Sequence, residues 1–467
     1  MLTRNDAANQ FISVMRVLYL AKTLNRVAIV PTFIPSHFLG PYVDFDLFYD
    51  LDGFMRRSHI PAVPMSRLKR AARLGEARPP HNDEVSCWSV SEQTTGMANL
   101  GAESMDAHGV WVHHWALPPM HRSLGGFDLA YDSLRLFDFD GQMRADWVAK
   151  VRREWLPQVA RPAKDDQGRP TKPLRGDGAL AANLKPGFEP DKSAPPTDQL
   201  FCVDNTMFVG PVMFPQPYQT PVETEPSIAG EGLSWLDAGV HVRFAPRVEA
   251  TLDALLARLF RDHATVPPFI SVHLRRGDFQ DFGGFTDLDK YVRAVGRVQA
   301  RVARRVAEPH SWRGPGKRSW DTQHAPRVRD ALAAASSGES KLEVVFTTDE
   351  TDAAFLRTVA REHGWRLFDH ASMGTLELLQ ARGLTGYTHE QVVDARARAR
   401  TQARAEQDVT RLTYQAQDDL AGWWLPVLDA ALLARGAGFV GTDRSTFSHL
   451  AGLRVKHWNG APTDLAS

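Results

Sequence analysis

Residues 269–279, Phe-Ile-Ser-Val-His-Leu-Arg-Arg-Gly-Asp-Phe, restrict the possible folds of this chain more than any other stretch. The apolar start of this run, residues 269–272, predicts a short buried strand, and Gly277 allows the backbone to turn after it. Arg275 and Arg276 would then lie at the carboxyl end of the strand, where open α/β sheets bind their ligands. A guanidinium there can hold two phosphate oxygens, although adjacent arginines also form ordinary surface ion pairs.

Two further segments repeat this order of a short strand followed by polar residues. Residues 342–350 predict a strand that ends in Thr and Asp, and residues 352–363 predict the helix that follows. Residues 438–451 run from an apolar strand into hydroxyl and charged side chains, with Ser445 or Thr446 as the N-cap of another helix. The amides of a helix start bind anions readily, although an ordinary capped helix has the same pattern. We therefore expect three strand ends to carry polar groups in one half of the chain.

Strands alternate with helices along both halves of the 467-residue chain, which is too long for one ordinary core. This pattern predicts two α/β domains, residues 1–245 and residues 246–467, with Pro246 opening the first helix of the second domain. Three segments interrupt the pattern: a mobile loop at about 160–198 and insertions at about 308–340 and 373–412.

Three other segments give local predictions. Residues 9–24 predict a buried helix that leads into a strand at 27–30, which Pro31 ends. Residues 42–48 are rich in aromatic side chains and are interpreted as a docking segment. Residues 422–433 predict an amphipathic helix packed against the carboxy-terminal sheet.

Composition excludes several classes of protein. Lys and Arg total 55 and Asp and Glu total 55, so the formal net charge is zero and a nucleic-acid-binding function is not expected. The two cysteines, Cys87 and Cys202, are too few for a disulfide scaffold or a zinc site, but they are enough for one bridge. No apolar run reaches the roughly 18 residues that span a bilayer, so we expect the chain as given to be soluble, without a membrane segment.

The polar strand ends together resemble those of the GDP-fucose-dependent O-fucosyltransferases. Residues 273–279, His-Leu-Arg-Arg-Gly-Asp-Phe, are similar to the arginine motif of that family. Residues 441–448, Gly-Thr-Asp-Arg-Ser-Thr-Phe-Ser, are similar to its carboxy-terminal donor-binding motif, and residues 458–460, Trp-Asn-Gly, to its usual ending. A weaker similarity to the opening unit of the family covers residues 9–31, while long intervening stretches match nothing.

This resemblance implies a GT-B-like architecture, in which two Rossmann-like domains face a central donor-binding cleft. It also implies an inverting transfer of fucose from GDP-fucose to a hydroxyl of a protein or glycan acceptor. The departing diphosphate gains negative charge in such a reaction, so the site needs hydrogen-bond donors more than a metal, and we expect neither metal nor cofactor. The family usually works in the lumen of the endoplasmic reticulum or Golgi. We expect no signal peptide in the chain as given, so its location stays unknown from this sequence.

The resemblance also assigns roles to individual residues. Arg275 matches the essential arginine of the family and would neutralise the β-phosphate as the bond to fucose breaks. Asp349 would accept hydrogen bonds from guanine or ribose, His273 would line the nucleoside pocket, and Asp278 would orient one of the two arginines. The other donor-binding residues would be Asn9, Arg276, Arg444, Ser445, Thr446 and Phe447, the last three supplying backbone amides and a hydroxyl to the phosphates.

The base that activates the acceptor is the least specified part of the predicted site. Some members of the family use a Glu three residues before the Asn of the first loop, and Asp6 stands at that offset from Asn9. An aspartate so close to a chain end is more often simply solvated. Residues 1–8 also lack the glycines that normally precede this Asn, so the chain is either truncated or has lost part of its first donor-binding loop.

Two other functions remain open. Asp138 and Asp140 follow a predicted strand at 134–137 with the spacing of a metal-binding pair, as in metal-dependent glycosyltransferases. The same spacing recurs at 44–46 and 287–289, so the pattern has little specificity. The other alternative is a catalytically silent protein that binds a nucleotide or a protein partner in the same cleft, and the missing glycines are its main support.

Overall fold

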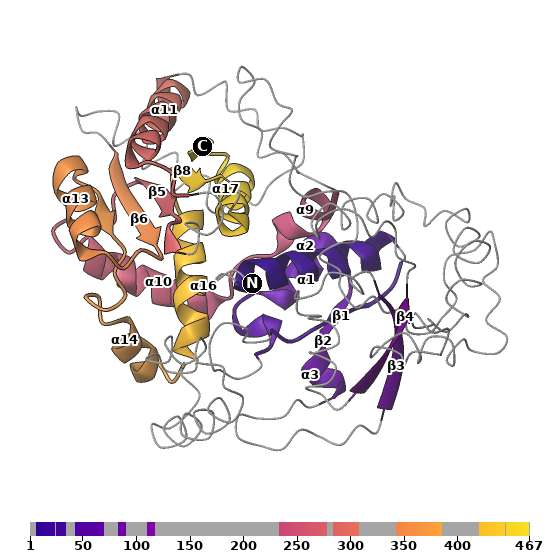
Figure 1. The fold of residues 1–467 in the computed structure, drawn as a ribbon. Coiled ribbons are helices and arrows are strands. Elements are labelled where there is room, and N and C mark those ends of the chain that lie inside the picture. Colours follow the sequence, from indigo (N-terminus) through magenta and orange to yellow (C-terminus); the bar gives the residue numbers. More distant parts are fainter. Residues whose placement is uncertain are drawn as a thin grey trace, which may run out of the picture.

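The computed structural model describes residues 6–23, 25–33, 43–69, 83–89, 110–116, 233–277, 284–307, 342–384, 420–443 and 445–466. These segments contain one five-stranded sheet and two two-stranded sheets, and all strand pairs in them are parallel (Figure 1). The α/β fold class predicted from the sequence is therefore confirmed. No helix of the described segments is long and apolar enough to cross a membrane.

The strand of the arginine motif is the middle strand of the five-stranded sheet. The strands of this sheet are β5 (Phe269–Leu274), β6 (Glu343–Thr348), β7 (Arg366–Leu367), β8 (Gly438–Thr442) and β9 (Thr463–Ala466). Their order across the sheet is β7-β6-β5-β8-β9, which is 3-2-1-4-5 when they are counted along the chain. This is the order of a Rossmann-like, doubly wound sheet. All six residues of β5 are buried, as expected for a central parallel strand covered on both faces.

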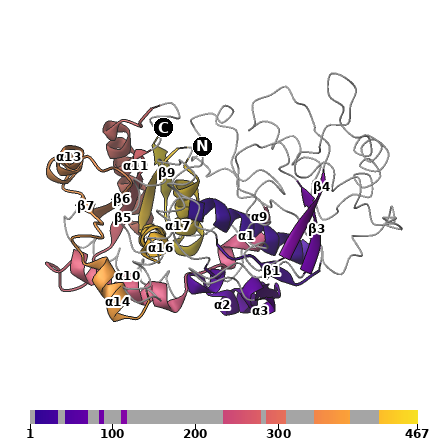
Figure 2. The ribbon, with the colours of Figure 1, turned by 60° about the horizontal axis from the view of Figure 1, so that its bottom comes forward.

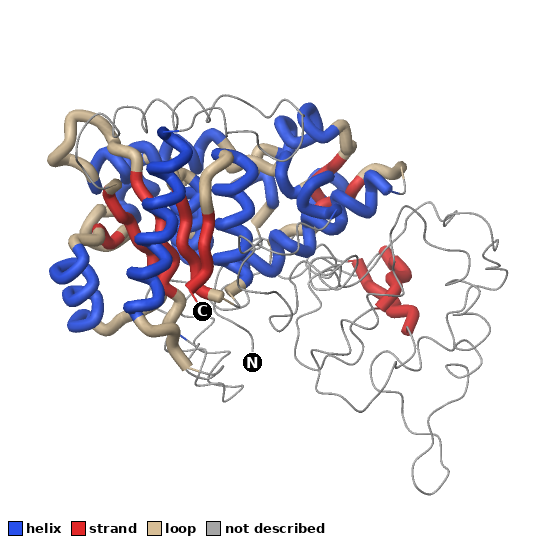
Figure 3. The backbone as a smooth tube through the Cα atoms, turned by 90° about the horizontal axis from the view of Figure 1, so that it is seen from above, coloured by secondary structure: helices blue, strands red, loops and turns tan. Residues whose placement is uncertain are grey.

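Helices cover both faces of this sheet (Figure 3). The face that carries Ile270, Val272 and Val440 forms one hydrophobic core with α11 and α13. The opposite face, which carries Phe269 and Phe439, packs against α10, α16 and α17. The helices around the sheet are α10 (Pro246–Leu259), α11 (Leu288–Ala307), α13 (Ala353–His363), α14 (Thr375–Ala381), α16 (Ala421–Ala434) and α17 (Thr446–Asn459).

Several predicted boundaries are confirmed in this part of the chain. Pro246 lies in the first turn of α10, and Asp352 is the N-cap of α13, where its side chain accepts a hydrogen bond from the amide of Ala354. Part of the predicted insertion at 373–412 forms helix α14, which packs against α10, and residues 385–412 lie outside the described segments. The predicted loop at 160–198 and the insertion at 308–340 also lie outside them.

The amino-terminal part begins with the long helix and short strand that its sequence predicts. These are α1 (Asp6–Thr23) and β1 (Ala28–Val30), and β1 pairs with β2 (Ala62–Pro64). Between and after them lie η1 (Phe45–Leu47), α2 (Leu51–Ser58) and α3 (Met65–Leu68). A separate pair is formed by β3 (Asp83–Ser89) and β4 (Val110–Ala116), and α9 (Leu233–Asp237) and η5 (Gly239–His241) lead back to the larger sheet.

The described part of the aromatic segment, residues 43–48, contributes its large side chains to the core, so the interpretation as a docking segment is wrong. Phe45, Phe48 and Tyr49 are each at most 4% exposed. The ring of Phe45 lies 4.7 Å from that of Tyr49, and the ring of Phe11 on α1 lies 4.9 Å from that of Tyr49. Because aromatic side chains bury large apolar areas, this cluster fixes α1 to the chain that follows β1.

Helix α16 is buried on nearly all sides, whereas its sequence was interpreted as amphipathic. One side contacts strands β5 and β6, and the others contact α10, α17 and α1. Trp423, Trp424, Leu428 and Leu432 are each at most 1% exposed. A helix that is covered all round needs no polar face, which explains its continuous apolar sequence.

Helices α1 and α17 lie side by side (Figure 2). The buried side chain of Arg454 on α17 contacts α1. The guanidinium of Arg454 lies 4.7 Å from the ring centre of Phe11, 4.9 Å from that of Phe244 and 5.7 Å from that of Trp458. It also forms a hydrogen bond with Tyr49, and burial lowers the pKa of Arg454. We call these five residues the Arg454 cage. The cage belongs to a core that runs continuously across residue 245, and the division into two domains there stays a prediction.

Candidate functional site

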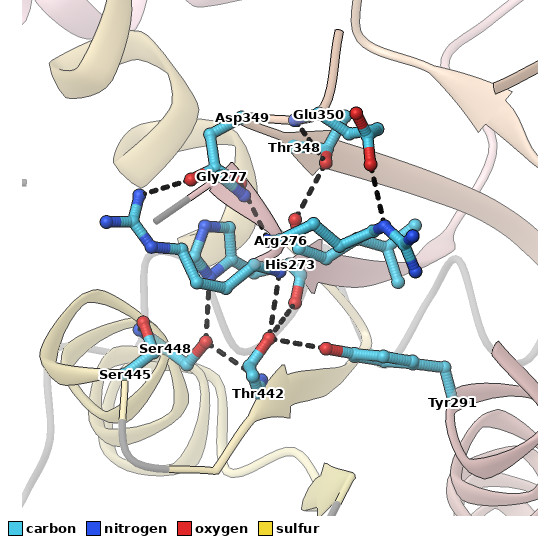
Figure 4. A network of polar contacts seen from close by, with 12 residues as sticks. His273, Arg276, Gly277, Tyr291, Thr348, Asp349, Glu350, Thr442, Ser445 and Ser448 are labelled. Atoms are coloured by element: carbon cyan, nitrogen blue, oxygen red, sulfur yellow. Dashed lines mark hydrogen bonds and ion pairs between the residues drawn. The ribbon is translucent and has the colours of Figure 1, made fainter. Parts of the chain in front are cut away.

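The three polar strand ends predicted from the sequence lie side by side at one edge of the sheet. β5 lies between β6 and β8, and all three run in the same direction, so their carboxyl ends meet. β6 precedes β5 in this order and β8 follows it on the other side, so the direction of strand progression reverses between β5 and β8. Open α/β sheets bind their ligands at such a reversal point. Figure 4 shows the polar network at this edge.

Arg275 and Asp349 form the centre of this network. The Nη1 atom of Arg275, whose side chain is 3% exposed, lies 2.6 Å from Oδ2 of Asp349. The other carboxylate oxygen of Asp349 accepts hydrogen bonds from the backbone amides of Arg276 at 2.8 Å and Gly277 at 3.0 Å. Asp349 was expected to bind guanine or ribose, which stays a prediction, whereas the structure places its carboxylate on the arginine motif itself.

This arrangement requires a glycine at position 277, because glycine has no side chain. A Cβ atom at position 277 would lie 2.1 Å from Oδ2 of Asp349, which is far inside van der Waals contact. The carboxylate therefore occupies the space that any other residue at this position would fill. The backbone of Gly277 does not have a positive φ, so the glycine serves the close approach of Asp349 and not the turn that the sequence predicts.

Arg276 points to a different set of partners. Its Nε atom donates to Oε2 of Glu350 at 2.7 Å, and its guanidinium lies 4.0 Å from the ring centre of Phe355 and 4.3 Å from that of Phe285. Burial alone would raise the pKa of Glu350, but hydrogen bonds from the amides of Asp352 and Thr351 and from Arg276 hold it below its usual value. Glu350 and the rings of Phe285 and Phe355 thus contact this guanidinium. The expected contact of Arg276 with the donor stays a prediction.

The start of α17 supplies the other polar side of the site. Ser445 is its N-cap, as the sequence predicts, and its hydroxyl accepts a hydrogen bond from the amide of Ser448 at 3.3 Å. Thr446 and Phe447 follow in the first turn, where backbone amides have no acceptor within the helix. The positive end of the helix dipole therefore lies beside the strand end that carries Arg275.

His273 connects β5 to this helix. Its Nδ1 atom lies 2.7 Å from the hydroxyl of Ser448, and its ring centre lies 4.9 Å from that of Phe447. Burial, and secondarily the charge of Arg275, lowers the pKa of His273 to about 3, so its ring is neutral near neutral pH. A Cβ at Gly441 would lie 2.7 Å from Cβ of Ser448, so this glycine allows β8 to approach the helix.

The structure thus brings most of the predicted site residues together. His273, Arg275, Arg276, Asp349, Ser445, Thr446 and Phe447 all lie at the carboxyl edge of the sheet or on the helix start beside it. Asp278 and Arg444 lie outside the described segments. Asp6 and Asn9 lie on α1, and of these two residues only the backbone is described. Their predicted roles therefore stay predictions.

Sequence reasoning missed four residues of the network: Tyr291, Thr442, Ser448 and Glu350. Thr442 and Ser448 lie inside the quoted motif at 441–448, where the strand-to-helix pattern could have singled them out. Glu350 follows Asp349 directly. Tyr291 has no local signal, because its place in helix α11 brings it to the site only through the fold.

The metal-binding alternative rests mainly on residues that the structure does not describe, since Asp138 and Asp140 are among them. Among the described residues, no group of three or more His, Cys, Asp or Glu side chains could hold a metal ion. Asp44 and Asp46 have the same spacing and lie in the described segment 43–69. Burial raises the pKa of Asp46, and the charge of Asp44 raises it further. Metal independence stays a prediction. The bridge between Cys87 and Cys202 also stays a prediction, and Cys202 lies outside the described residues.

The chain matches no protein-family profile, and it matches no curated protein sequence. Its structure is similar to solved structures of POFUT1, a GDP-fucose protein O-fucosyltransferase. The crystal structure of POFUT1 in complex with GDP is 14% identical, with a TM-score of 0.40, over 98% of this chain and 95% of that chain. The complex with GDP-fucose is 15% identical, with a TM-score of 0.39, over 97% and 93% of the two chains. Such low scores do not bear on individual residues, so function has to be argued from the site.

Proposed function

We propose that this protein is an inverting glycosyltransferase that transfers fucose from GDP-fucose to a hydroxyl group of a protein or glycan. One observation carries the proposal: Arg275 and the start of α17 meet at the reversal point of a Rossmann-like sheet. A guanidinium beside a helix start suits a diphosphate. The resemblance of residues 273–279 and 441–448 to the motifs of GDP-fucose-dependent O-fucosyltransferases specifies which sugar nucleotide we expect.

In the proposed reaction the bond between fucose and the β-phosphate breaks while the acceptor oxygen attacks from the opposite side. Negative charge grows on the departing diphosphate, and Arg275 would stabilise it together with the amides of Thr446 and Phe447. One such contact typically contributes on the order of 3 kcal/mol to transition-state stabilisation. Neutral His273 would line the nucleoside pocket without adding charge.

The ion pair with Asp349 is compatible with this role of Arg275. A guanidinium carries five N–H donors in a rigid plane, so it can contact a carboxylate on one side and a phosphate on another. Asp349 holds one edge of the guanidinium through Nη1 and is itself held by two backbone amides. We therefore assign Asp349 a positioning role in addition to the predicted contact with guanine or ribose.

The acceptor side of the reaction is proposed on the sequence alone. Asp6 would be the base that takes the proton of the acceptor hydroxyl, and Asn9 would contact the donor. Neither metal nor cofactor is needed, because Arg275 and the helix start supply the charge that a metal would otherwise provide.

Ligand-dependent thermal unfolding tests the nucleotide part of the proposal. A ligand that binds only the folded state stabilises it by about 2.7 kcal/mol at a hundred times its Kd. We expect GDP and GDP-fucose to raise Tm clearly, and UDP and ADP to raise it less. An equal response to all four nucleotides, or no response to any, would contradict a guanine-nucleotide sugar donor.

Fucose release from GDP-fucose then separates an enzyme from a silent binder. The proposed transferase should hydrolyse the donor slowly without an acceptor, and this rate should not change when EDTA is added. Binding without release would favour the catalytically silent alternative. Release that EDTA abolishes would favour the metal-dependent one.

A further inference from the structure

The hydroxyl of Thr442 is the point where three parts of the site connect. Thr442 ends β8 and is 0% exposed. Its Oγ1 atom donates to the carbonyl oxygen of His273 at 3.0 Å and accepts from the amide of Arg275 at 2.9 Å. The hydroxyl of Tyr291, on α11, lies 2.6 Å from the same oxygen (Figure 4).

The direction of the Tyr291 contact follows from counting protons. The carbonyl of His273 can only accept, so it takes the single proton of Thr442, and the amide of Arg275 can only donate. With its proton assigned to this carbonyl, Thr442 has none left for Tyr291, so we assign the Tyr291 hydroxyl as the donor. Burial raises the pKa of Tyr291 to about 12, so this donor keeps its proton at all ordinary pH values.

These contacts begin where the backbone pairing between β5 and β8 ends. The last paired residues of that ladder are Val272 and Val440. Beyond these two residues, the Thr442 hydroxyl replaces the backbone pairing and forms hydrogen bonds with the carbonyl of His273 and the amide of Arg275. On the other side of β5, the hydroxyl of Thr348 donates to the carbonyl of Leu274 at 2.7 Å. The side chains of Thr442 and Thr348 thus hold the end of β5 on both sides, directly before and at Arg275.

Thr442 also joins the two helix layers of the sheet. Its backbone amide donates to the hydroxyl of Ser448 on α17 at 2.9 Å, while its side chain is held by Tyr291 on α11. A shift of α11 would therefore reach the backbone of Arg275 through two hydrogen bonds.

We propose that Tyr291 and Thr442 are positioning residues that fix the backbone of Arg275, and through it the direction of the Arg275 guanidinium toward the donor phosphates. This inference rests on the proposed function, since it concerns the same site. It assigns no contact with the donor to either residue. Their effect is to keep the guanidinium where it matches the charge of the transition state.

Tyr291→Phe tests this inference, because it removes one hydroxyl and keeps the buried ring. The variant loses the bonds of the Tyr291 hydroxyl to Thr442, to Thr286 and to the backbone of Arg275. We expect kcat for fucose release from GDP-fucose to fall about fivefold to tenfold, with KM changed by less than about twofold. Thr442→Ser keeps the hydroxyl and should retain most of the wild-type kcat. Tyr49→Phe is the matched control, since it also removes one buried tyrosine hydroxyl, but in the Arg454 cage. Tyr49→Phe should lower Tm, as Tyr291→Phe should, but it should leave kcat unchanged.

Hydrogen–deuterium exchange of the peptide that covers residues 269–277 gives a second measurement, which needs no substrate. We expect faster exchange in this peptide for Tyr291→Phe, and wild-type exchange for Tyr49→Phe. Wild-type kcat together with wild-type exchange in Tyr291→Phe would overturn the inference, as would equal effects of the two Tyr variants on kcat. Failure of the proposed function looks different, because the wild-type protein itself would then release no fucose.

Discussion

Arg275 and Asp349 depend on each other at the scale of single residues. Each side chain is a charge largely removed from water, and a lone charge there would be costly. Asp349 is held in turn by the amides that follow Arg275 in the chain. The arginine motif therefore provides the guanidinium and also the backbone that fixes its counter-ion.

Gly277→Ala should break this arrangement, because the new Cβ would meet Oδ2 of Asp349 at 2.1 Å. The carboxylate would have to move and would lose Arg275, its two amides or both. We expect GDP to raise Tm far less in this variant than in the wild-type protein. Gly296→Ala is the control, since nothing lies within 4 Å of a Cβ there and the position is in α11. It should stabilise the fold by about 0.5–1 kcal/mol and leave the response to GDP intact. A normal GDP response in Gly277→Ala would contradict the proposed role of this glycine.

Lysine substitutions should distinguish the roles of Arg275 and Arg276. Arg275→Lys keeps the charge but loses the planar fork, so fucose release should fall by roughly two to three orders of magnitude in a folded protein. Arg276→Lys should reduce release less and should lower Tm, because it loses stacking on Phe285 and Phe355. Far-UV circular dichroism is the folding control. Wild-type release by a folded Arg275→Lys variant would disprove the phosphate role of this residue.

Helix α17 connects two distant parts of the protein at the scale of secondary-structure elements. Its first turn lies at the site through Ser445 and Ser448, and its second half carries Arg454 in the cage formed with α1. The helix dipole, the N-cap and the packing against β8 all fix the same end of the helix.

Ser445→Ala should weaken both the helix and the site. Loss of an N-cap hydroxyl typically costs about 1 kcal/mol, so Tm should fall, and the affinity for GDP should fall as well because the helix start shifts. Asp352→Ala removes an equivalent cap from α13, where its carboxylate accepts from the amide of Ala354 at 2.8 Å. It should lower Tm similarly without changing the affinity for GDP. Isothermal titration calorimetry of both variants decides the matter, and equal GDP affinities would show that the cap of α17 serves the fold alone.

The elements of the larger sheet could be predicted from sequence because each one carries its own local pattern. Phe269–Leu274 is preceded by two prolines and followed by two arginines, and Pro246, Asp352 and Ser445 mark helix starts by their own chemistry. Three strand ends in a parallel sheet must then share an edge, so the place of the site followed from element order alone.

What the sequence could not predict depends on residues far apart in the chain. The partner of Arg275 lies 74 positions later, and Tyr291 meets Thr442 across 151 positions. For the same reason, the sequence of residues 43–48 and 422–433 does not reveal that most of their large apolar side chains are buried. Whether such apolar residues face solvent, a partner or the core depends on what the rest of the chain lays against them.

Buried histidines link the stability of the whole molecule to pH. Burial lowers the pKa of His273 to about 3 and the pKa values of His241 and His449 to about 4, from an ordinary value of 6.5. Between about pH 4 and pH 6.5 the unfolded chain therefore binds more protons than the folded chain. The free energy of unfolding should decrease as pH falls through this range, and these groups should have no effect above about pH 7.5.

Urea unfolding at about pH 7.5 and about pH 5 measures this difference. We expect a clearly lower midpoint at the lower pH, and a smaller difference between the two midpoints in His241→Gln, which removes the most accessible of the three groups. Equal midpoints at both pH values in the wild-type protein would contradict the assigned burial of these rings.

The Arg454 cage has a consequence for how the protein is made. Phe11, which contacts the guanidinium of Arg454 at 4.7 Å, leaves the ribosome hundreds of residues before its partner. Until residue 454 has been synthesised, α1 can pack against Phe45 and Tyr49 but not against α17, so part of its apolar surface stays uncovered. Folding of this core is therefore a late event that depends on contacts between distant parts of the chain, and such contacts form slowly.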